Sequence, residues 1–294
     1  MDTACSIVML AGPGDHDSVQ VIFNHVVRTS RYPFSFRALT LDTLPSRKYP
    51  IGSPATVKLL KTANAMLSAG EIDAIFNTAE VSPEIEARHF GHRLKRKRDF
   101  RGIPLLGWAI GIERAPTDFI CHFDSDILMH AWEGYSWVSA ALQQLANDPA
   151  IMFVAPAGGP PLNGSVNPTS QKTFSSRRFV VDRRRLSALL PLPATHNSWK
   201  RRLLMYLGGE SSYWPWESHV DAAIGQSDFS NIWLGDHRAW FLHSPDHGER
   251  WKSLLDQLVA NCEAGRFPHE QLGKGELDLD AWHLGTSDPS TLRQ

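Results

Sequence analysis

Cysteine, net charge and long apolar runs are all scarce in this sequence. Its three cysteines, Cys5, Cys121 and Cys262, show neither a CxxC nor a CxxxH spacing, so we expect reduced, buried thiols. The first apolar stretch, SIVMLAG, is too short for a signal peptide and lacks a basic flank, and no later run reaches a membrane-spanning length. We therefore expect a cytoplasmic protein with no transmembrane segment; peripheral association with a membrane is left open.

An excess of charge of one sign is also lacking, because 30 basic residues face 31 acidic ones and the formal net charge is -1. No field of the whole molecule would therefore draw the protein to nucleic acid or to an anionic membrane. Two basic stretches, 92–101 and 175–186, stand out, but neither interleaves aromatic residues in a stacking pattern. We predict solvated faces there and no nucleic-acid partner.

Apolar residues are plentiful, and their period switches repeatedly between the strand and the helix pattern. With 294 residues, of which 42% are hydrophobic, the chain can bury a large core. Strands are predicted at 5–10, 35–42, 71–78, 118–124 and 151–156. Helices are predicted at 19–27, 53–70, 104–116 and 134–148. This alternation predicts an α/β fold, with a mainly parallel sheet flanked by helices on both faces.

Two carboxylates, Asp124 and Asp126, stand at the end of the predicted strand 118–124, where parallel sheets bind their ligands. If the extended conformation persists, both side chains point the same way and Ser125 points the other way. Close carboxylates repel unless one is protonated or a cation lies between them, and oxygen ligands suit Mg2+ or Mn2+. The alternative is that the two aspartates only cap the following loop and helix.

The segment ERAPTDFICHFDSDILM resembles family 2-like glycosyltransferases of the A-type fold, in which a strand leads into a DxD motif that binds the metal of a nucleotide-sugar. SIVMLAGPGD is similar to the family's first strand and nucleotide-facing loop. FRALTLDTLP is similar to its second strand, whose terminal acid, Asp42 here, lies by the base or ribose. FRGIPLLGWAIGIERA is similar to the glycine-punctuated helix before the metal strand.

The resemblance implies a single domain over 1–294, with a Rossmann-like, nucleotide-sugar-binding half (1–130) and an acceptor-binding and catalytic half (131–294). It implies a nucleoside-diphosphate sugar as donor, by default a UDP-sugar, a hydroxyl-bearing acceptor, and Mn2+ or Mg2+ as cofactor. The residues expected to contact the nucleotide-sugar and its metal are Ala11, Gly12, Asp42, Arg101, Asp124, Ser125 and Asp126.

LGGESSYWPWES is similar to the family's Gly-Gly segment followed by an acidic catalytic base, which corresponds to Glu217 here. The family often has a second acid directly after the base, where this chain has Ser218, so Glu210 and Asp221 remain alternatives. Inverting transfer requires a carboxylate to take the proton of the acceptor hydroxyl, a task worth roughly 100- to 10,000-fold in rate.

Two tryptophans, Trp214 and Trp216, directly precede the candidate base and could form the wall of an acceptor site, because the C–H face of a pyranose packs on an indole ring. The alternative is that both are core residues.

Histidines near the end of the catalytic domain complete the metal site of many A-type glycosyltransferases, which makes His243 and His247 candidate ligands. The two histidines beside the DxD motif are read differently: His122 as a packed neutral imidazole and His130 as a loop residue.

Three further expectations depend on the resemblance. In a nucleotide-sugar enzyme, Arg98 or Arg101 could contact the diphosphate, and the run 175–186 could line the site of an anionic acceptor. The Gly- and Pro-rich stretch 156–171 is expected to be a mobile loop near the active site, between the two halves.

Two other functions compete with a glycosyltransferase. The strand followed by DxD also matches haloacid-dehalogenase-like phosphatases, with the first aspartate as nucleophile and the second as acid/base. Those enzymes usually have this motif near the N-terminus and a Thr or Val at the position of Leu128. The other alternative is a non-catalytic sugar-binding module.

Overall fold

The computed structural model describes part of the chain. The residues described are 3–81, 83–162, 168–193, 195, 198–199, 203, 207, 211 and 213–283. None of the helices within these ranges is both long and apolar enough to cross a membrane.

Strands and helices follow one another along the first half of the chain as the periodicity predicts, with one further helix over 83–90. In order they are β1 (Cys5–Ala11), α1 (Val19–Ser30), β2 (Phe36–Leu41), α2 (Pro54–Ser68), β3 (Ala74–Asn77), α3 (Pro83–Phe90), α4 (Gly107–Arg114) and β4 (Phe119–Asp124). The cap of α2 shows why the local prediction works. Ser53 precedes Pro54, and its side chain accepts a hydrogen bond from the backbone N–H of Thr56 at 3.2 Å.

The second half of the chain adds shorter elements. In order they are β5 (Ile127–Ala131), α5 (Trp137–Asn147), β6 (Ile151–Ala155), β7 (Ala157–Gly158), β8 (Thr169–Gln171), β9 (Arg178–Asp182), α6 (Arg183–Ala188), α8 (Trp216–Gly225), β10 (Ser230–Trp233), β11 (Ala239–His243), α9 (Glu249–Glu263) and α10 (Leu279–His283). Short 3-10 helices lie at Pro13–Asp15, Thr78–Glu80 and His269–Gln271.

An eight-stranded sheet has the order β3-β2-β1-β4-β9-β6-β10-β8. The pairs β3–β2, β2–β1, β1–β4 and β6–β10 are parallel, whereas β9 is antiparallel to β4 and β6, and β8 is antiparallel to β10. Parallel pairs therefore predominate, which confirms the predicted fold class. Strands from both predicted halves of the chain share this sheet.

A second sheet has the order β5-β11-β7, and it corrects two expectations. His130 is not a loop residue: it lies in β5, where it is 6% exposed and its Nδ1 lies 2.7 Å from the carbonyl oxygen of Cys262. The stretch 156–171 is not a continuous loop, since β7 and β8 lie near its two ends. Residues 163–167 lie outside the described ranges.

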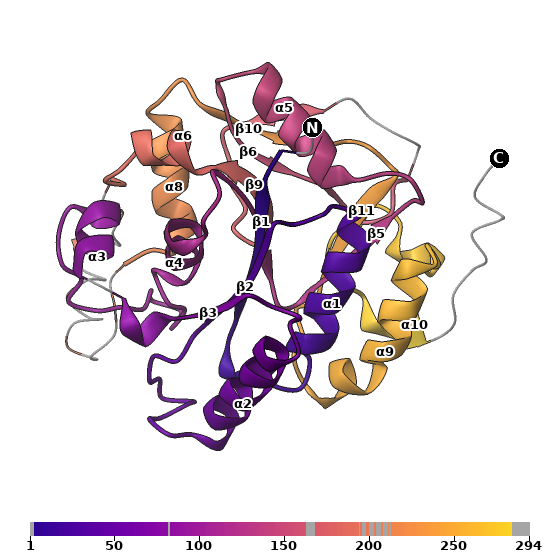
Figure 1. Ribbon diagram of the computed structural model, residues 1–294, viewed down its shortest axis with the longest axis horizontal. Coiled ribbons are helices and arrows are strands. Elements are labelled where there is room, and N and C mark those ends of the chain that lie inside the picture. Colours follow the sequence, from indigo (N-terminus) through magenta and orange to yellow (C-terminus); the bar gives the residue numbers. More distant parts are fainter. Residues whose placement is uncertain are drawn as a thin grey trace.

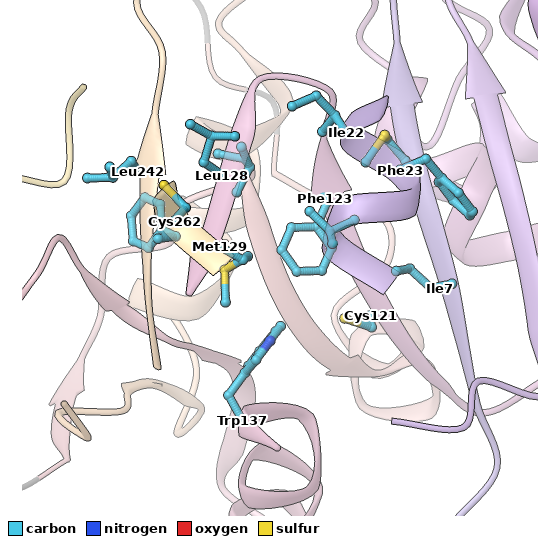
Figure 2. Packing of buried hydrophobic residues seen from close by; sticks show 14 of the residues in the cluster. Ile7, Ile22, Phe23, Cys121, Phe123, Leu128, Met129, Trp137, Leu242 and Cys262 are labelled. Carbon is cyan, nitrogen blue, oxygen red and sulfur yellow. The ribbon is translucent and has the colours of Figure 1, made fainter. Parts of the chain in front are cut away.

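Helices cover both faces of the large sheet, with α4 and α8 on one side and α1, α2 and α9 on the other (Figure 1). Each side has its own buried hydrophobic cluster. Figure 2 shows part of the first cluster, to which Phe123 of β4, Ile22 of α1 and Met129 of the neighbouring β5 all belong. The two clusters fix β4, and hence the position of the DxD motif at its end.

The three cysteines are free and buried, as the sequence predicts. Burial raises the pKa of Cys5 to about 12, so this thiol is protonated at neutral pH and is a poor nucleophile. Cys121 and Cys262 belong to the first hydrophobic cluster (Figure 2).

Candidate active site

The carboxyl ends of β1, β2 and β4 bring three predicted site residues to one edge of the sheet. Ala11 pairs with Leu41 in the β1–β2 register, and Leu10 pairs with Asp124 in the β1–β4 register. The backbone N–H of Asp42 donates to the carbonyl oxygen of Ala11 at 2.8 Å. The edge predicted for ligand binding therefore contains the ends of the first two strands and the DxD motif.

Ser125 and the loop after β1 are held together by Asp15, which ends the short 3-10 helix that follows this strand. Asp15 Oδ2 accepts hydrogen bonds from Ser125 Oγ and from the backbone N–H of Gly12, both at 2.7 Å. The N–H of Ser125 also donates to the carbonyl oxygen of Leu10 at 3.1 Å. The predicted nucleotide loop and the DxD motif are thus joined by one buried carboxylate.

Asp124 is mostly buried, with 19% of its side chain exposed. Its Oδ1 accepts a hydrogen bond from Trp108 Nε1 at 3.1 Å and lies 3.1 Å from His122 Nε2. Burial, reinforced by the charge of Asp126, raises the pKa of Asp124 well above its usual range. Burial also lowers the pKa of His122 to about 3, which confirms the predicted neutral imidazole.

Trp108 reaches Asp124 because α4 packs very close to β1. A Cβ added at Gly111 would lie 2.5 Å from Val8 Cγ1, and one added at Gly107 would lie 2.9 Å from Leu10 Cδ2. A larger residue at either position would push α4 away from the strand. The glycine-punctuated helix noted in the sequence therefore sets the distance between the Trp108 indole and the DxD motif.

Asp126 has the opposite environment, because two histidines approach its Oδ2. His243 Nε2 lies 3.1 Å away and His247 Nε2 lies 3.3 Å away, while His247 Nδ1 lies 3.4 Å from Asp15 Oδ1. Burial acts to raise the pKa of Asp126, but the hydrogen bonds from the two histidines outweigh it and lower the pKa to about 2. The same bonds to Asp126 and Asp15 raise the pKa of His247 to about 10. Both predicted histidines thus lie at the DxD motif.

The atoms around Asp126 fit a divalent cation in type. Asp126 Oδ1 and His243 Nδ1 are buried and have no hydrogen-bond partner in the described part of the structure. Carboxylate oxygens and imidazole nitrogens are the donors that Mn2+ accepts, and carboxylates suit Mg2+. As the side chains lie, no three His, Cys, Asp or Glu residues within the described ranges are arranged to hold a metal ion. Coordination by these groups would therefore require side-chain rotation.

Asp42 is bound by an arginine that the sequence left as a diphosphate contact. Arg98 donates from Nη1 to Asp42 Oδ2 at 2.9 Å and from Nη2 to Oδ1 at 3.1 Å. Burial raises the pKa of Asp42 and Arg98 opposes this shift. The other candidate, Arg101, is half exposed and pairs with Asp99 through its Nε at 3.1 Å. Arg98 thus fixes the carboxylate expected beside the base or ribose.

Glu217 lies in the first turn of α8 and is half-buried. Its Oε1 accepts a hydrogen bond from the backbone N–H of Ser176 at 3.3 Å. Burial raises its pKa, with Arg101 among the charges that oppose the shift. Asp221, one turn later, also has a pKa raised by burial and accepts from the N–H of Phe174. The other alternative base, Glu210, lies outside the described residues.

The two predicted acceptor tryptophans have different environments. Trp216 is fully buried and stacks on Trp108, with ring centroids 6.0 Å apart and an interplanar angle of 13°. Its ring is therefore not available to an acceptor, which corrects the sequence expectation: it packs against the indole that binds Asp124. Trp214 is partly exposed and contacts Phe100 edge-on at 5.3 Å, so its contact with an acceptor stays a prediction.

No family model matches this sequence, and no curated protein matches it significantly. Among solved structures, the chain is similar to galactosyltransferase LgtC in complex with donor and acceptor sugar analogs, with a TM-score of 0.43, 11% identity, and coverage of 90% of this chain and 98% of that chain. It is also similar to a mannosyltransferase from Pyrobaculum calidifontis in complex with GDP-Man and Mn2+, with a TM-score of 0.40 and 13% identity.

The mannosyltransferase match covers 66% of this chain and 48% of that chain, so the chain spans about half of its length. A third similar structure is mannosyl-3-phosphoglycerate synthase from Rubrobacter xylanophilus, with a TM-score of 0.34, 15% identity, and coverage of 62% and 54%. Similarity at this level assigns no activity, and membership of family 2 remains a prediction. The function therefore depends on the residues of the site.

Proposed function

We propose that this protein is a metal-dependent glycosyltransferase that moves a sugar from a nucleoside-diphosphate donor to an acceptor hydroxyl, with inversion. One observation carries the proposal. At the carboxyl edge of a mainly parallel sheet, Asp126 contacts two histidines and keeps one buried oxygen without a hydrogen-bond partner among the described residues. Burying such an oxygen without a partner costs free energy of folding, unless a ligand supplies the missing positive partner.

Asp124, Asp126, His243 and His247 are the residues that would hold the cation. A bound Mn2+ or Mg2+ supplies positive charge that stabilises the negative charge growing on the departing diphosphate. Asp15 keeps the DxD motif and the loop after β1 in one arrangement, through the hydrogen bonds of its Oδ2. The chain's own contribution at this edge is therefore to position the diphosphate before reaction.

The nucleotide contacts of the proposal lie in residues 1–130 and the acceptor contacts in residues 131–294. Asp42, fixed by Arg98, faces the base or ribose, and Ala11 with Gly12 forms the loop that approaches the nucleotide. Arg101 is half exposed and remains available to a phosphate. On the other side, Trp214 provides a partly exposed ring for the acceptor sugar.

Glu217 is the proposed base. Burial raises the pKa of this carboxyl, and a carboxylate with a raised pKa takes a proton more readily than an exposed glutamate does. The proton of the acceptor hydroxyl moves to a Glu217 carboxylate oxygen as the acceptor oxygen attacks the anomeric carbon. Inversion follows if this attack occurs on the face opposite the departing diphosphate.

A thermal-shift panel tests the proposal and identifies the nucleotide, with UDP-sugars as the default donors. UDP, GDP, TDP and CDP are each added with and without Mn2+, because a ligand that binds only the folded state raises Tm. We expect one nucleotide to raise Tm markedly, and only with Mn2+ present. If no nucleotide raises Tm in Mn2+, the proposal is wrong.

The phosphatase alternative is tested in the same samples with p-nitrophenyl phosphate. It needs Asp124 as the attacking nucleophile, whereas Trp108 and His122 occupy the Oδ1 of this carboxyl. We therefore expect no hydrolysis.

The sugar-binding alternative predicts ligand binding without turnover, so release of sugar to an acceptor or to water separates it from an enzyme.

A further inference from the structure

A cavity of about 500 Å³ lies beside the candidate site, where β8, β9, β10 and β11 meet. It borders the site at two points. The backbone N–H of Asp124 donates to the carbonyl oxygen of Arg177 at 2.7 Å, and that of His243 donates to the carbonyl oxygen of Gly275 at 2.8 Å. Both Arg177 and Gly275 line the cavity, and every lining residue lies between 157 and 276. The cavity thus belongs to the half of the chain predicted to bind the acceptor.

Arg178 lines this cavity and is 1% exposed. Its Nη1 donates to Ser175 Oγ at 2.9 Å, but Nε and Nη2 are buried with no hydrogen-bond partner in the part of the chain that the structure describes. Its guanidinium carbon lies 3.4 Å from the ring centroid of Phe241 and 4.8 Å from that of Trp233. Cation–π contacts offset some of the cost of burial, but they satisfy no N–H donor.

Among the described residues Arg178 is the one arginine that is buried, and it lacks the carboxylate partner that several more exposed arginines have. Arg98 pairs with Asp42, and Arg184 pairs with Asp182 at 2.8 Å. Within the described residues, no carboxylate oxygen lies within 4.0 Å of the Arg178 guanidinium. The charges of Glu217 and Asp124 act on Arg178 only from beyond ion-pair distance. A buried cation without a counter-ion in contact is costly in a protein interior, so the position is expected to have a partner that the chain does not supply.

A second cation lines the same cavity. The side chain of Arg177 is 40% exposed, and its Nη1 lies 3.9 Å from Glu276 Oε1, whose side chain is 69% exposed. An ion pair this long and this exposed contributes little, so an incoming anion can replace Glu276 without a large loss. Burial, with the charge of Arg177, lowers the pKa of Arg178 to about 9, while Glu217 and Asp124 oppose the shift, and Arg178 is therefore cationic at neutral pH.

We propose that the cavity binds an anionic group of the acceptor, a phosphate or a carboxylate, through Arg178 and Arg177. The inference depends on the proposed function, because it names the acceptor class of that site. The atoms Nε and Nη2 form one edge of the guanidinium, and this edge donates two parallel hydrogen bonds to two oxygens of one anion. Since Arg178 is covered, the anion reaches it through the cavity, past the partly exposed ring of Trp233.

The donor's diphosphate is the other source of such an anion, and the lining residues argue against it. None of them comes from residues 1–130, which contain the loop after β1, Asp42 and the DxD motif. An anion in this cavity would thus be surrounded entirely by the acceptor half. The site is adjacent to the DxD motif through Arg177, which is the position an acceptor needs relative to the donor.

The test uses the full chain and four probes at constant ionic strength: inorganic phosphate, glycerol 3-phosphate, glycerate and, as the uncharged match, glycerol. Affinities are measured by calorimetry and by thermal shift. We expect the three anions to bind and glycerol not to bind. Arg178→Met keeps an apolar stem beside the two rings. It should lower the affinity for the anions at least about 10-fold, which is the loss expected when hydrogen bonds to a charged group disappear.

Two more variants keep the test decisive. Arg177→Gln changes a partly exposed side chain, so this variant should fold and can be measured even if Arg178→Met does not fold. We expect it to bind the anions about 3- to 10-fold more weakly. Arg238→Gln removes a cation that pairs with Asp236 and does not line the cavity, and it should leave anion binding unchanged. In every variant, binding of the nucleotide selected by the panel in Mn2+ should stay within about 2-fold of the original, because none of the proposed metal-holding residues lines the cavity.

The outcomes separate the inference from the proposed function. Anions that bind no better than glycerol, or that bind Arg178→Met and Arg177→Gln unchanged, overturn the inference. So does competition between phosphate and the nucleotide for one site, because the anion is then the donor's diphosphate and the glycosyltransferase proposal stands. Anion binding that depends on both arginines in a protein that binds no nucleotide overturns the proposed function and, with it, the acceptor role.

Discussion

The acidic edge, made of Asp15, Asp124 and Asp126, and the cavity around Arg178 lie on neighbouring strands, yet they accommodate buried charge by different means. At the acidic edge, the Asp126 carboxylate is contacted by the imidazole nitrogens of His243 and His247. In the cavity, positive charge is met by aromatic rings, which leave the guanidinium donors unsatisfied.

The difference shows what each region lacks. The acidic edge has a buried carboxylate oxygen without a donor, and the cavity has buried N–H groups without an acceptor, both judged within the described residues. Two ligands of opposite charge, a divalent cation at the DxD motif and an anion at Arg178, would satisfy both regions. Substitutions that act on one region and spare the other can therefore break or sharpen the comparison.

The largest effect is expected at Asp126. Asp126→Ala removes the carboxylate shared by the two histidines. Nucleotide affinity in Mn2+ should fall by more than about 100-fold, because loss of a hydrogen-bond partner outside the metal's own ligands already lowers metal affinity roughly 10- to 100-fold. The metal-free protein should keep its fold, because the loss also relieves repulsion with Asp124. Calorimetry with Mn2+ and nucleotide checks this, with Asp118→Ala, a half-exposed surface change, as the control. Unchanged affinity would remove the metal role from the motif.

The next effect is expected at Glu217, which lies within the electrostatic range of Arg178. Glu217→Gln keeps the shape of the side chain but cannot accept a proton, so turnover should fall by about 100-fold or more while donor affinity stays within a few-fold. Asp221→Asn on the same helix is the matched control, because burial raises the pKa of Asp221 as well. If Asp221→Asn loses turnover and Glu217→Gln does not, Asp221 is the base.

The pH dependence sharpens the same prediction. Burial raises the pKa of Glu217 above its usual value of 4.5, and only the ionised carboxylate accepts the proton. Activity should therefore fall as the pH decreases through a value above 4.5. The residual activity of Glu217→Gln should lack this acidic limb, which is measured by turnover at saturating donor between pH 4.5 and 8.

Much of the large sheet follows from local sequence, and the reasons are visible in its elements. β1, β2 and β4 are mainly apolar runs that end at a Gly or an Asp, and α2 has both a Ser cap and a proline at its start. β5 was missed, because it begins directly after the DxD motif with no further turn signal. The position of β9 between β4 and β6 depends on pairing between distant segments, which local periodicity does not encode.

The site is predictable to a similar extent. The location of Asp124 and Asp126 at the carboxyl edge and the approach of His243 and His247 to Asp126 agree with the expectations. The hydrogen bond from Ser125 to Asp15 joins residues that are 110 positions apart in the sequence, and no local sequence pattern predicts it. Trp216 was ambiguous, because an indole beside a candidate base suits either a core or a sugar site, and only its packing on Trp108 decides between them.

A smaller effect is expected at Trp108. Trp108→Phe keeps an aromatic ring against Trp216 but removes the Nε1–H that donates to Asp124 Oδ1. We expect Mn2+ to bind about 10-fold more weakly, as for other outer hydrogen-bond partners, with anion binding at the Arg178 cavity unchanged. Trp137→Phe, in the other hydrophobic cluster, controls for the loss of an indole. Equal losses of Mn2+ affinity in both variants would show that general packing, and not the hydrogen bond, is responsible.

The smallest effect is expected at Glu263, which lies away from both regions and contributes to the stability of the fold at different pH values. Glu263 of α9 accepts hydrogen bonds from His25 and Arg28, and these lower its pKa from 4.5 to about 2. A carboxyl with a depressed pKa in the folded state stabilises the protein above pH 4.5, and this contribution is lost as the pH falls toward 2. Glu263→Gln should therefore lower Tm by no more than about 2–4 °C at pH 6 and by less at pH 3. Glu249→Gln, at the exposed start of the same helix, should change Tm little at either pH. A difference between Glu263→Gln and the original protein that grows as the pH falls would contradict this assignment.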